Sequence, residues 1–200
     1  DSYALWRACT AAFDDPETAW VFEPKAAAAA SLETLAGALL RHRVALQPNR
    51  HPAIWQGNAR GLVKHAGGGV RRLFDEAGWD LGAVRDVIQI RRTDFPYLSG
   101  PKIVNYWLFV MSSYMAWPTQ NLAALTVAPD RHVIAGSIQL GLVEAGASVE
   151  VVARRWADVL TGSPLLPVDL HTPLWLWSRL GFPALELAHA DEELKPPFVR

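Results

Sequence analysis

The segment "FPYLSGPKIVNYWLF" (Phe95–Phe109) joins a tight turn to the start of an apolar helix. Its Ser-Gly-Pro sequence predicts a turn that ends at Pro101, and proline is favoured at the first position of a helix. We therefore predict a helix over Pro101–Ala116, with Lys102 in its first turn. Burying an ammonium group is costly unless the group is paired or used. Lys102 is therefore either a solvated residue of a helix start or a nucleophile held in a pocket.

Helical patterns recur along the chain, whereas no run of alternating β-branched residues between tight turns predicts a strand. Ser31–Leu46 begins with a capping serine, and Ala26–Ala30 reads as the lead-in to this helix. The other predicted helices span residues 3–13, 55–65, 70–77, 81–91, 130–142, 149–160 and 169–180. In the helix after the turn, the predicted buried stripe is Ile103, Trp107, Val110, Met111 and Tyr114. The sequence therefore predicts an all-α fold with about nine or ten short helices in a single domain over residues 1–200. The C-terminal "ELKPPFVR" reads as a tail.

Composition limits the class of protein. The chain has 19 basic and 20 acidic residues, so its net charge of -1 gives no general attraction to nucleic acid. Cys9 is the single cysteine, which excludes an internal disulfide and a cysteine-ligated zinc or iron–sulfur site and favours a cytoplasmic location. The six histidines show no metal-ligand spacing, so we predict no metal. The apolar stretch Ile103–Trp117 is too short to span a bilayer, so we predict no membrane partner.

A second segment, "APDRHVIAGSIQLGL" (Ala128–Leu142), begins a predicted amphipathic helix with Pro-Asp. Asp130 has two interpretations. It could cap the helix by accepting backbone N–H groups. It could instead be an ionised catalytic carboxylate that stabilises a cationic sugar. Asp169 occupies a similar Val-Asp-x-His sequence; we predict that it is a cap, and it is the runner-up for the catalytic carboxylate.

Three segments taken together resemble the helix-hairpin-helix DNA glycosylase superfamily, and most of all its archaeal 8-oxoguanine DNA glycosylases. They are "LSGPKIVNYW", "PDRHVIAGSIQLGL" and "HTPLWLWSRLGF" (His171–Phe182). Gly-x-x-Lys and Val-Asp-Thr-His are the corresponding signatures of the superfamily. The interval from Lys102 to Asp130 (130 − 102 = 28) fits these glycosylases better than the shorter interval of the endonuclease III branch. The likeness covers Leu35–Phe182 and implies two lobes around a cleft.

The resemblance also implies an activity in base excision repair. The enzyme would remove an oxidised or otherwise modified purine, such as 8-oxoguanine, from damaged double-stranded DNA, with or without lyase activity. Lys102 would attack the sugar C1′ as a Schiff-base-forming nucleophile, and Asp130 would stabilise the oxocarbenium-like transition state. The amides of the hairpin residues Leu98, Ser99 and Gly100 would face a DNA phosphate. The protein would need no cofactor, would act as a monomer and would associate with the nucleoid.

The resemblance further implies residues that hold the extruded base. Pro129 would line the base pocket, Trp175 would pack against the base, and Trp55 would form a second wall. Three positions depart from the family pattern: His171 stands where an aspartate reads the purine, Leu5 where a glutamine is expected, and Phe95 where a second lysine is expected. These departures leave the identity of the base open.

Two other functions remain open. A glycosidase of a free modified nucleoside or nucleotide needs no long basic groove, which suits the net charge of -1. A non-catalytic helical domain would use the fold to bind nucleic acid or protein, and Lys102 and Asp130 would then be only structural. The basic residues that could form a DNA groove, or an ordinary solvated surface, are Arg41, Arg43, Arg50, Arg60, Lys64, Arg91 and Arg92.

Overall fold

A computed structural model describes residues 2–184, and the tail predicted at "ELKPPFVR" lies outside these residues. The described chain is all-helical and contains no strand, with one isolated bridge between Asp80 and Gln120. Its α-helices are α1 (Ser2–Asp14), α2 (Pro24–Ala29), α3 (Leu32–Arg41), α4 (His51–Ala66), α5 (Val70–Glu76), α6 (Leu81–Ile90), α7 (Pro101–Tyr114), α8 (Arg131–Gln139), α9 (Val149–Val159) and α10 (His171–Arg179). Three short 3₁₀ helices complete it: η1 (Ala19–Phe22), η2 (Leu122–Ala124) and η3 (Pro167–Leu170). Within residues 2–184, no helix is both long and apolar enough to cross a membrane.

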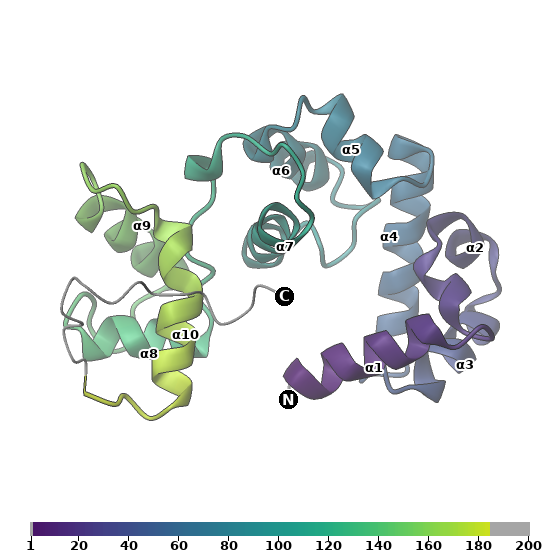
Figure 1. Cartoon of the computed structure of the whole chain (residues 1–200), viewed down its shortest axis with the longest axis horizontal. Coiled ribbons are helices and arrows are strands. Elements are labelled where there is room, and N and C mark those ends of the chain that lie inside the picture. Colours follow the sequence, from purple (N-terminus) through teal and green to yellow (C-terminus); the bar gives the residue numbers. More distant parts are fainter. Residues whose placement is uncertain (1, 185–200) are drawn as a thin grey trace.

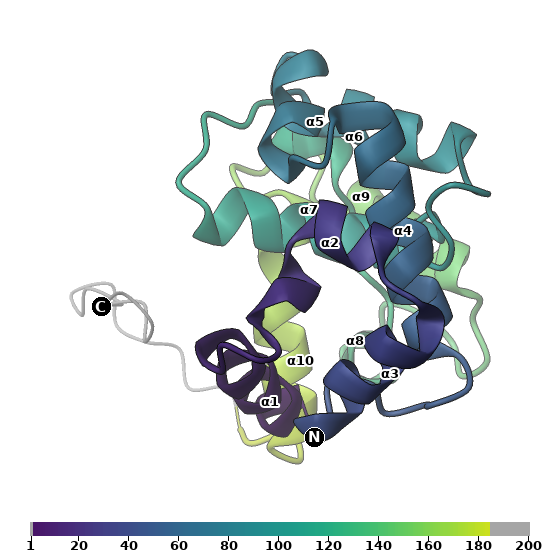
Figure 2. The same cartoon turned by 90° about the vertical axis from the view of Figure 1, so that its right-hand side faces the viewer.

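The helices form three groups, and each group has its own cluster of buried side chains (Figure 1). The first group, α1–α4, packs around Leu35 and Leu39. The second, α5–α7 with the end of α4, encloses Phe74 and Leu108. The third, α8–α10, packs around Trp156. In Figure 1 the second group lies between the other two, and Figure 2 shows the first group in front when the molecule is turned by 90°.

Most predicted helices are present with ends within a few residues of those expected. The region around α2 and α3 is an exception, because Ala26–Ala30 does not lead into the next helix. It forms most of the separate helix α2. This helix ends at Ala29, the backbone of Ala30 is extended (φ −63°, ψ 155°), and Ser31 then caps α3. The predicted end of α3 at Leu46 is also wrong. The helix stops at Arg41, and Arg43 adopts a left-handed conformation (φ 59°) that turns the chain toward α4.

The buried stripe predicted for α7 is wrong in its position. The side chains that are fully shielded are Val104, Asn105 and Leu108, whereas Tyr114 is 67% exposed. Asn105 explains part of the difference between the predicted and the observed buried face of α7. Its side chain donates to the Thr126 carbonyl (2.6 Å) and accepts from the Thr126 amide (2.9 Å). An amide paired twice with the backbone can be buried at little cost. The face of α7 predicted to be core is divided: Trp107 and Met111 pack against the second core cluster, and Ile103 and Tyr114 line the pocket described below.

The turn before α7 is seated on α4 by two glycines. A Cβ atom on Gly61 would lie 2.2 Å from the Asp94 carbonyl oxygen, and one on Gly57 would lie 2.6 Å from Cγ of Pro96. Side chains of α4 then hold the turn: Asn58 donates to the Pro96 carbonyl (3.0 Å), and His65 Nε2 lies 2.7 Å from the Asp94 carboxylate. The absence of side chains at the two glycines thus fixes where α7 begins.

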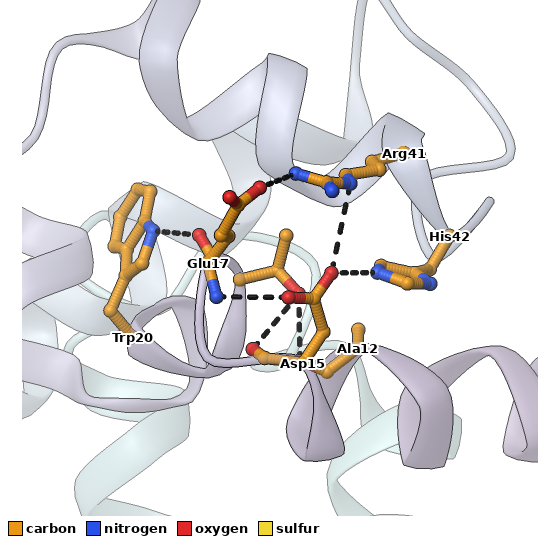
Figure 3. Close-up of polar contacts among 7 residues, drawn as sticks. Ala12, Asp15, Glu17, Trp20, Arg41 and His42 are labelled. Carbon is orange, nitrogen blue, oxygen red and sulfur yellow. Dashed lines mark hydrogen bonds and ion pairs between the residues drawn. The ribbon is translucent and has the colours of Figure 1, made fainter.

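A polar cluster fastens the end of α1 to the end of α3 (Figure 3). Asp15 accepts a hydrogen bond from the Glu17 amide (2.9 Å) and contacts His42 Nε2 (2.8 Å), while Arg41 bridges Asp15 and Glu17. These contacts lower the pKa of the Asp15 carboxyl; the largest causes are the bonds from the Glu17 amide and from His42. The cluster therefore fixes α1, whose first turns form one wall of the pocket described next.

Candidate functional site

Side chains from three helices and from the segment before α8 line a pocket of ≈ 550 Å³, here called the charged pocket. From α7, from the segment before α8 and from α10 come its central residues: Lys102, Tyr106, Phe109, Asp130, His171 and Trp175. Helix α1 adds Tyr3, Leu5 and Trp6. The volume lies within the range of small-molecule sites in proteins, about 300–1,000 Å³. Lys102, Asp130, His171 and Trp175, which were predicted from three separate segments, therefore line one pocket.

Lys102 is in the first turn of α7, directly after Pro101. The side chain is exposed at the pocket and forms no ion pair with any residue from 2 to 184. The desolvation expected from its apolar neighbours is therefore small in this conformation. An ammonium with solvent access can be held at a pocket without a partner, because it keeps its hydration. Lys102 is thus a solvated helix-start residue and, at the same time, part of a pocket wall.

Asp130 has the capping role, one of the two interpretations that the sequence left open, and its catalytic role stays a prediction. It is the N-cap of α8, and its Oδ1 accepts hydrogen bonds from the amides of His132 (2.8 Å) and Val133 (2.9 Å). Its Oδ2 has no hydrogen-bond partner within residues 2–184, and the residue lines the charged pocket. Capping therefore fixes one carboxylate oxygen and leaves the second available to a bound molecule.

His171, the first residue of α10, is 7% exposed and sits beside two aromatic rings of α7. Its ring centroid lies 5.2 Å from that of Tyr106 and 6.1 Å from that of Phe109. Burial lowers the pKa of His171; the nearby Asp130 opposes this effect and Lys102 adds to it. Burial likewise raises the pKa of Tyr106, with smaller contributions from Tyr114 and Asp130. His171 is therefore a neutral imidazole at neutral pH, between the two charges of the pocket.

Trp175 is fixed from two sides. The guanidinium carbon of Arg179 lies 4.9 Å from the centroid of its ring, one turn further along α10. The His132 ring meets it edge-on at 5.7 Å, and His132 Nδ1 is in turn bonded to the Ser178 hydroxyl (3.1 Å). Helix α10 itself packs closely on α8, where a Cβ on Gly136 would lie 3.3 Å from Leu174. The indole is thus a supported wall against which a flat ring could stack.

The predicted phosphate-binding turn has its amides engaged within the turn itself. The amide of Leu98 donates to the Pro96 carbonyl (2.7 Å), that of Ser99 to Phe95 (3.0 Å) and that of Gly100 to Tyr97 (3.1 Å). A backbone N–H that already has a partner is less available to an anion. Contact between these amides and a phosphate stays a prediction.

Trp55 and Pro129 do not line the charged pocket, although both were predicted to hold the base. Pro129 is buried between the lining residues Ala128 and Asp130. Trp55 lies in a larger pocket of ≈ 690 Å³, here called the apolar pocket, and its indole donates to the Val21 carbonyl (2.8 Å). Other residues lining the apolar pocket are Phe22, Leu39, Arg50, Leu73 and Trp107. Asp169 is also outside the charged pocket. It is not the N-cap of α10, as was predicted, because that position is Leu170; it lies in η3, where its carboxylate accepts from the Leu166 amide (2.8 Å).

Several lining residues were missed by the sequence reasoning. Tyr106 and Phe109 follow Lys102 by four and seven positions, a spacing that places all three on one face of a helix and could have revealed them. Trp6 carries no such signal, because its place in the pocket depends on how α1 packs against distant segments. Of the family departures, Leu5 does line the charged pocket. Phe95, by contrast, is fully buried in the second core cluster.

The basic residues considered for a groove behave differently from one another. Arg41 and Lys64 have carboxylate partners. Arg50 lies over the ring of Tyr97 in the turn, 5.3 Å from its centroid. Arg91–Arg92, just before the turn, is exposed and forms no ion pair in the described part of the chain. Arg43, just after α3, and Arg60, in α4, have no carboxylate partner in the described residues either, so unpaired positive charge lies both at the turn and beside α3 and α4.

Comparisons of the chain with models of known protein families, with curated proteins and with solved structures found no match.

Proposed function

We propose that this protein is a DNA base-excision N-glycosylase that removes a modified purine, with a helix-hairpin-helix glycosylase-like fold whose two lobes meet at the charged pocket. The observation that carries the proposal is the meeting of Lys102 and Asp130 in one aromatic pocket. Glycosidic bond cleavage at a sugar needs a group that stabilises positive charge at C1′ and a nucleophile at the same carbon. A base lifted out of the stack needs an aromatic surface, which Trp175 and Tyr106 offer.

The proposed step assigns one task to each charged residue. Lys102 first gives its ammonium proton to solvent. Its free Nζ lone pair then forms a bond to C1′ while the C1′–N9 bond breaks and its electron pair leaves with the base, which takes a proton from solvent. One amine proton then passes to O4′ as the sugar ring opens, which leaves an iminium ion between C1′ and Nζ. The free Oδ2 of Asp130 stabilises the positive charge that develops on the sugar.

Local charge supports a ligand that carries phosphate. The segments that contribute α7, α8 and α10 carry three basic residues, Lys102, Arg131 and Arg179, against one acidic residue, Asp130. The exposed pair Arg91–Arg92 adds positive charge before the turn. Such a surface attracts phosphate even though the net charge of the chain is -1. A free nucleotide would meet the same charges, so the experiment includes one.

Borohydride trapping tests the proposal directly, because reduction of the iminium ion joins the protein covalently to DNA. The panel is a set of duplexes that each carry one modified purine, together with an abasic-site duplex and free modified nucleosides and nucleotides. Lys25→Gln is the matched control for Lys102→Gln, because both lysines are exposed and each follows the proline that begins a helix. We expect an adduct with the wild type and with Lys25→Gln, and none with Lys102→Gln at an unchanged melting temperature.

The other outcomes are equally informative. Base release from duplex DNA without an adduct would retain the glycosylase and remove the nucleophilic role of Lys102. Release from free nucleosides alone would favour the nucleosidase alternative. If no substrate of the panel loses its base, the proposed function is wrong.

A further inference from the structure

His171 has one feature that its place in the pocket does not explain. Its Nδ1 atom is buried and has no hydrogen-bond partner among residues 2–184. Buried polar groups in proteins nearly always have a partner, so an unpaired one calls for a functional explanation. Nε2 makes no hydrogen bond within residues 2–184 either. Unlike Nδ1, it is not fully buried, so it keeps access to the pocket.

The unequal surroundings of the two nitrogens decide which one carries the proton. A neutral imidazole has one N–H donor and one acceptor nitrogen. A buried N–H without a partner is rarer than a buried acceptor without one. We therefore assign the proton to Nε2, which leaves the acceptor lone pair of Nδ1 in the wall. The aromatic rings of Tyr106 and Phe109 beside the imidazole offer no acceptor of ordinary strength, so this N–H is left for a bound molecule.

We propose that His171 reads the base by donating its Nε2–H to an acceptor on the purine, either a carbonyl oxygen or an unprotonated ring nitrogen. This inference rests on the proposed function, since it deepens the role of the same pocket. A carboxylate at this position would accept hydrogen bonds and would select purine N–H groups. A pocket with an aspartate at this position would select a purine that presents an N–H donor. The charged pocket would instead select a purine that presents an acceptor toward α10.

The charged neighbours fit this role. Asp130 and Lys102 both interact electrostatically with His171, and they act in opposite directions on its charge. A neutral donor between them can bind an uncharged base without adding to either charge. Trp175 supplies the stacking surface. In this arrangement His171 contacts the edge of the base and Trp175 contacts its face.

The test measures binding of purines to the full chain by tryptophan fluorescence, which needs no turnover. The probes are 9-methylpurine, 9-methyladenine and 9-methylhypoxanthine, with the 1-deaza, 3-deaza and 7-deaza analogues of the last two. Each deaza analogue loses one ring acceptor, except 1-deaza-9-methylhypoxanthine, which loses the N1–H donor and serves as a control, and 9-methylpurine lacks the carbonyl. The proteins are the wild type, His171→Gln, which keeps a donor, His171→Asp, which only accepts, and His171→Phe, which keeps a flat ring without hydrogen bonds. Melting temperatures establish that each variant is folded.

We expect the loss of one particular acceptor to weaken binding to the wild type and to His171→Gln by about tenfold, the size of one hydrogen bond, and to leave His171→Phe unaffected. His171→Asp should bind the acceptor-bearing purine about tenfold more weakly than the wild type does. The inference is overturned if no acceptor distinguishes the wild type from His171→Phe, which includes the case in which no probe binds.

Base release separates this inference from the proposed function. If purines bind with the expected dependence on His171 but no duplex loses a base, the reading role stands and the glycosylase does not. If a duplex loses its base equally well with His171→Asp, the glycosylase stands and the reading role does not.

Discussion

Two pockets in the described part of the chain share the Leu5 and Ile103 side chains in their linings, and these two pockets differ in chemistry more than in size. The apolar pocket is the larger, ≈ 690 Å³ against ≈ 550 Å³. None of its lining residues is acidic. The charged pocket holds a lysine, a carboxylate with one free oxygen and a buried neutral histidine. The larger pocket is the usual first choice for an active site. Here the smaller one contains the groups that bond cleavage at a sugar requires.

The difference follows from what each pocket is made of. The apolar pocket lies over α4 and is bounded largely by side chains of the first core cluster, such as Phe22 and Leu39. It is therefore an incompletely filled part of a core. The charged pocket is bounded by two helix starts, those of α7 and α10, and by the N-cap of α8. Helix starts bring polar groups and free backbone N–H groups together, and this makes them suited to charged ligands.

Asp130→Asn should give the largest effect, a decrease in the rate of base release of about 10²–10⁴-fold, because an amide cannot stabilise positive charge as a carboxylate does. Its stability should change little, since asparagine caps helices as well as aspartate does. Single-turnover base release and thermal unfolding measure the two effects.

Asp80→Asn is the matched control, because Asp80 caps α6 by accepting from the Ala83 amide (2.9 Å) and lies outside both pockets. Equal losses of activity in Asp80→Asn and Asp130→Asn would mean that helix capping, not charge, explains the loss.

Trp175→Ala and Trp55→Ala compare the two pockets directly. Stacking of a base on an aromatic side chain is worth about 1–3 kcal/mol, so Trp175→Ala should lower kcat/KM by about 5–150-fold. Trp55→Ala should destabilise the fold, since Trp55 packs edge-on against Phe22 at 5.6 Å, but should leave base release unchanged when the protein is folded. Steady-state kinetics well below the melting temperature of each variant separate these effects. A loss of base release in Trp55→Ala but not in Trp175→Ala would mean that the base binds in the apolar pocket.

The class of fold and part of the candidate site could be predicted from the sequence, because they depend on residues that are close together along the chain. Pro101, Asp130 and the apolar periods are local signals, so the helices and the capping role of Asp130 could be predicted. The buried face of α7 could not, because it depends on the pairing of Asn105 with a segment that is 21 residues away. Trp55 was assigned to the wrong pocket for the same reason: which faces of distant helices meet is decided by packing.

Gly61→Ala tests how much the close contact between α4 and the turn before α7 contributes to the unfolding free energy. Its new Cβ would lie 2.2 Å from the Asp94 carbonyl oxygen, so the turn or α4 has to move. Overpacking of this kind costs about 1–3 kcal/mol of unfolding free energy. Gly37→Ala is the control in α3, where a Cβ meets nothing within 4 Å. It should raise the unfolding free energy by up to about 1 kcal/mol, the helix propensity difference. Urea denaturation measures both, and an equal response of the two variants would show that the contact is relieved without cost.

The smallest expected effect is the pH dependence of the contact that holds the turn. Hydrogen bonds from His65 and then Lys64 lower the pKa of the Asp94 carboxyl. A carboxyl whose pKa is lower in the folded state stabilises the fold above its unfolded pKa of about 3.9, and this stabilisation is lost as the pH falls through the folded pKa. The melting temperature of Asp94→Asn should therefore lie below that of the wild type at neutral pH, and the difference should close below about pH 4. Asp75→Asn, an exposed carboxylate without a hydrogen bond in the described chain, should show no such closing difference. A constant deficit at all pH values would mean that the shape of the Asp94 side chain, and not its charge, holds the turn against α4.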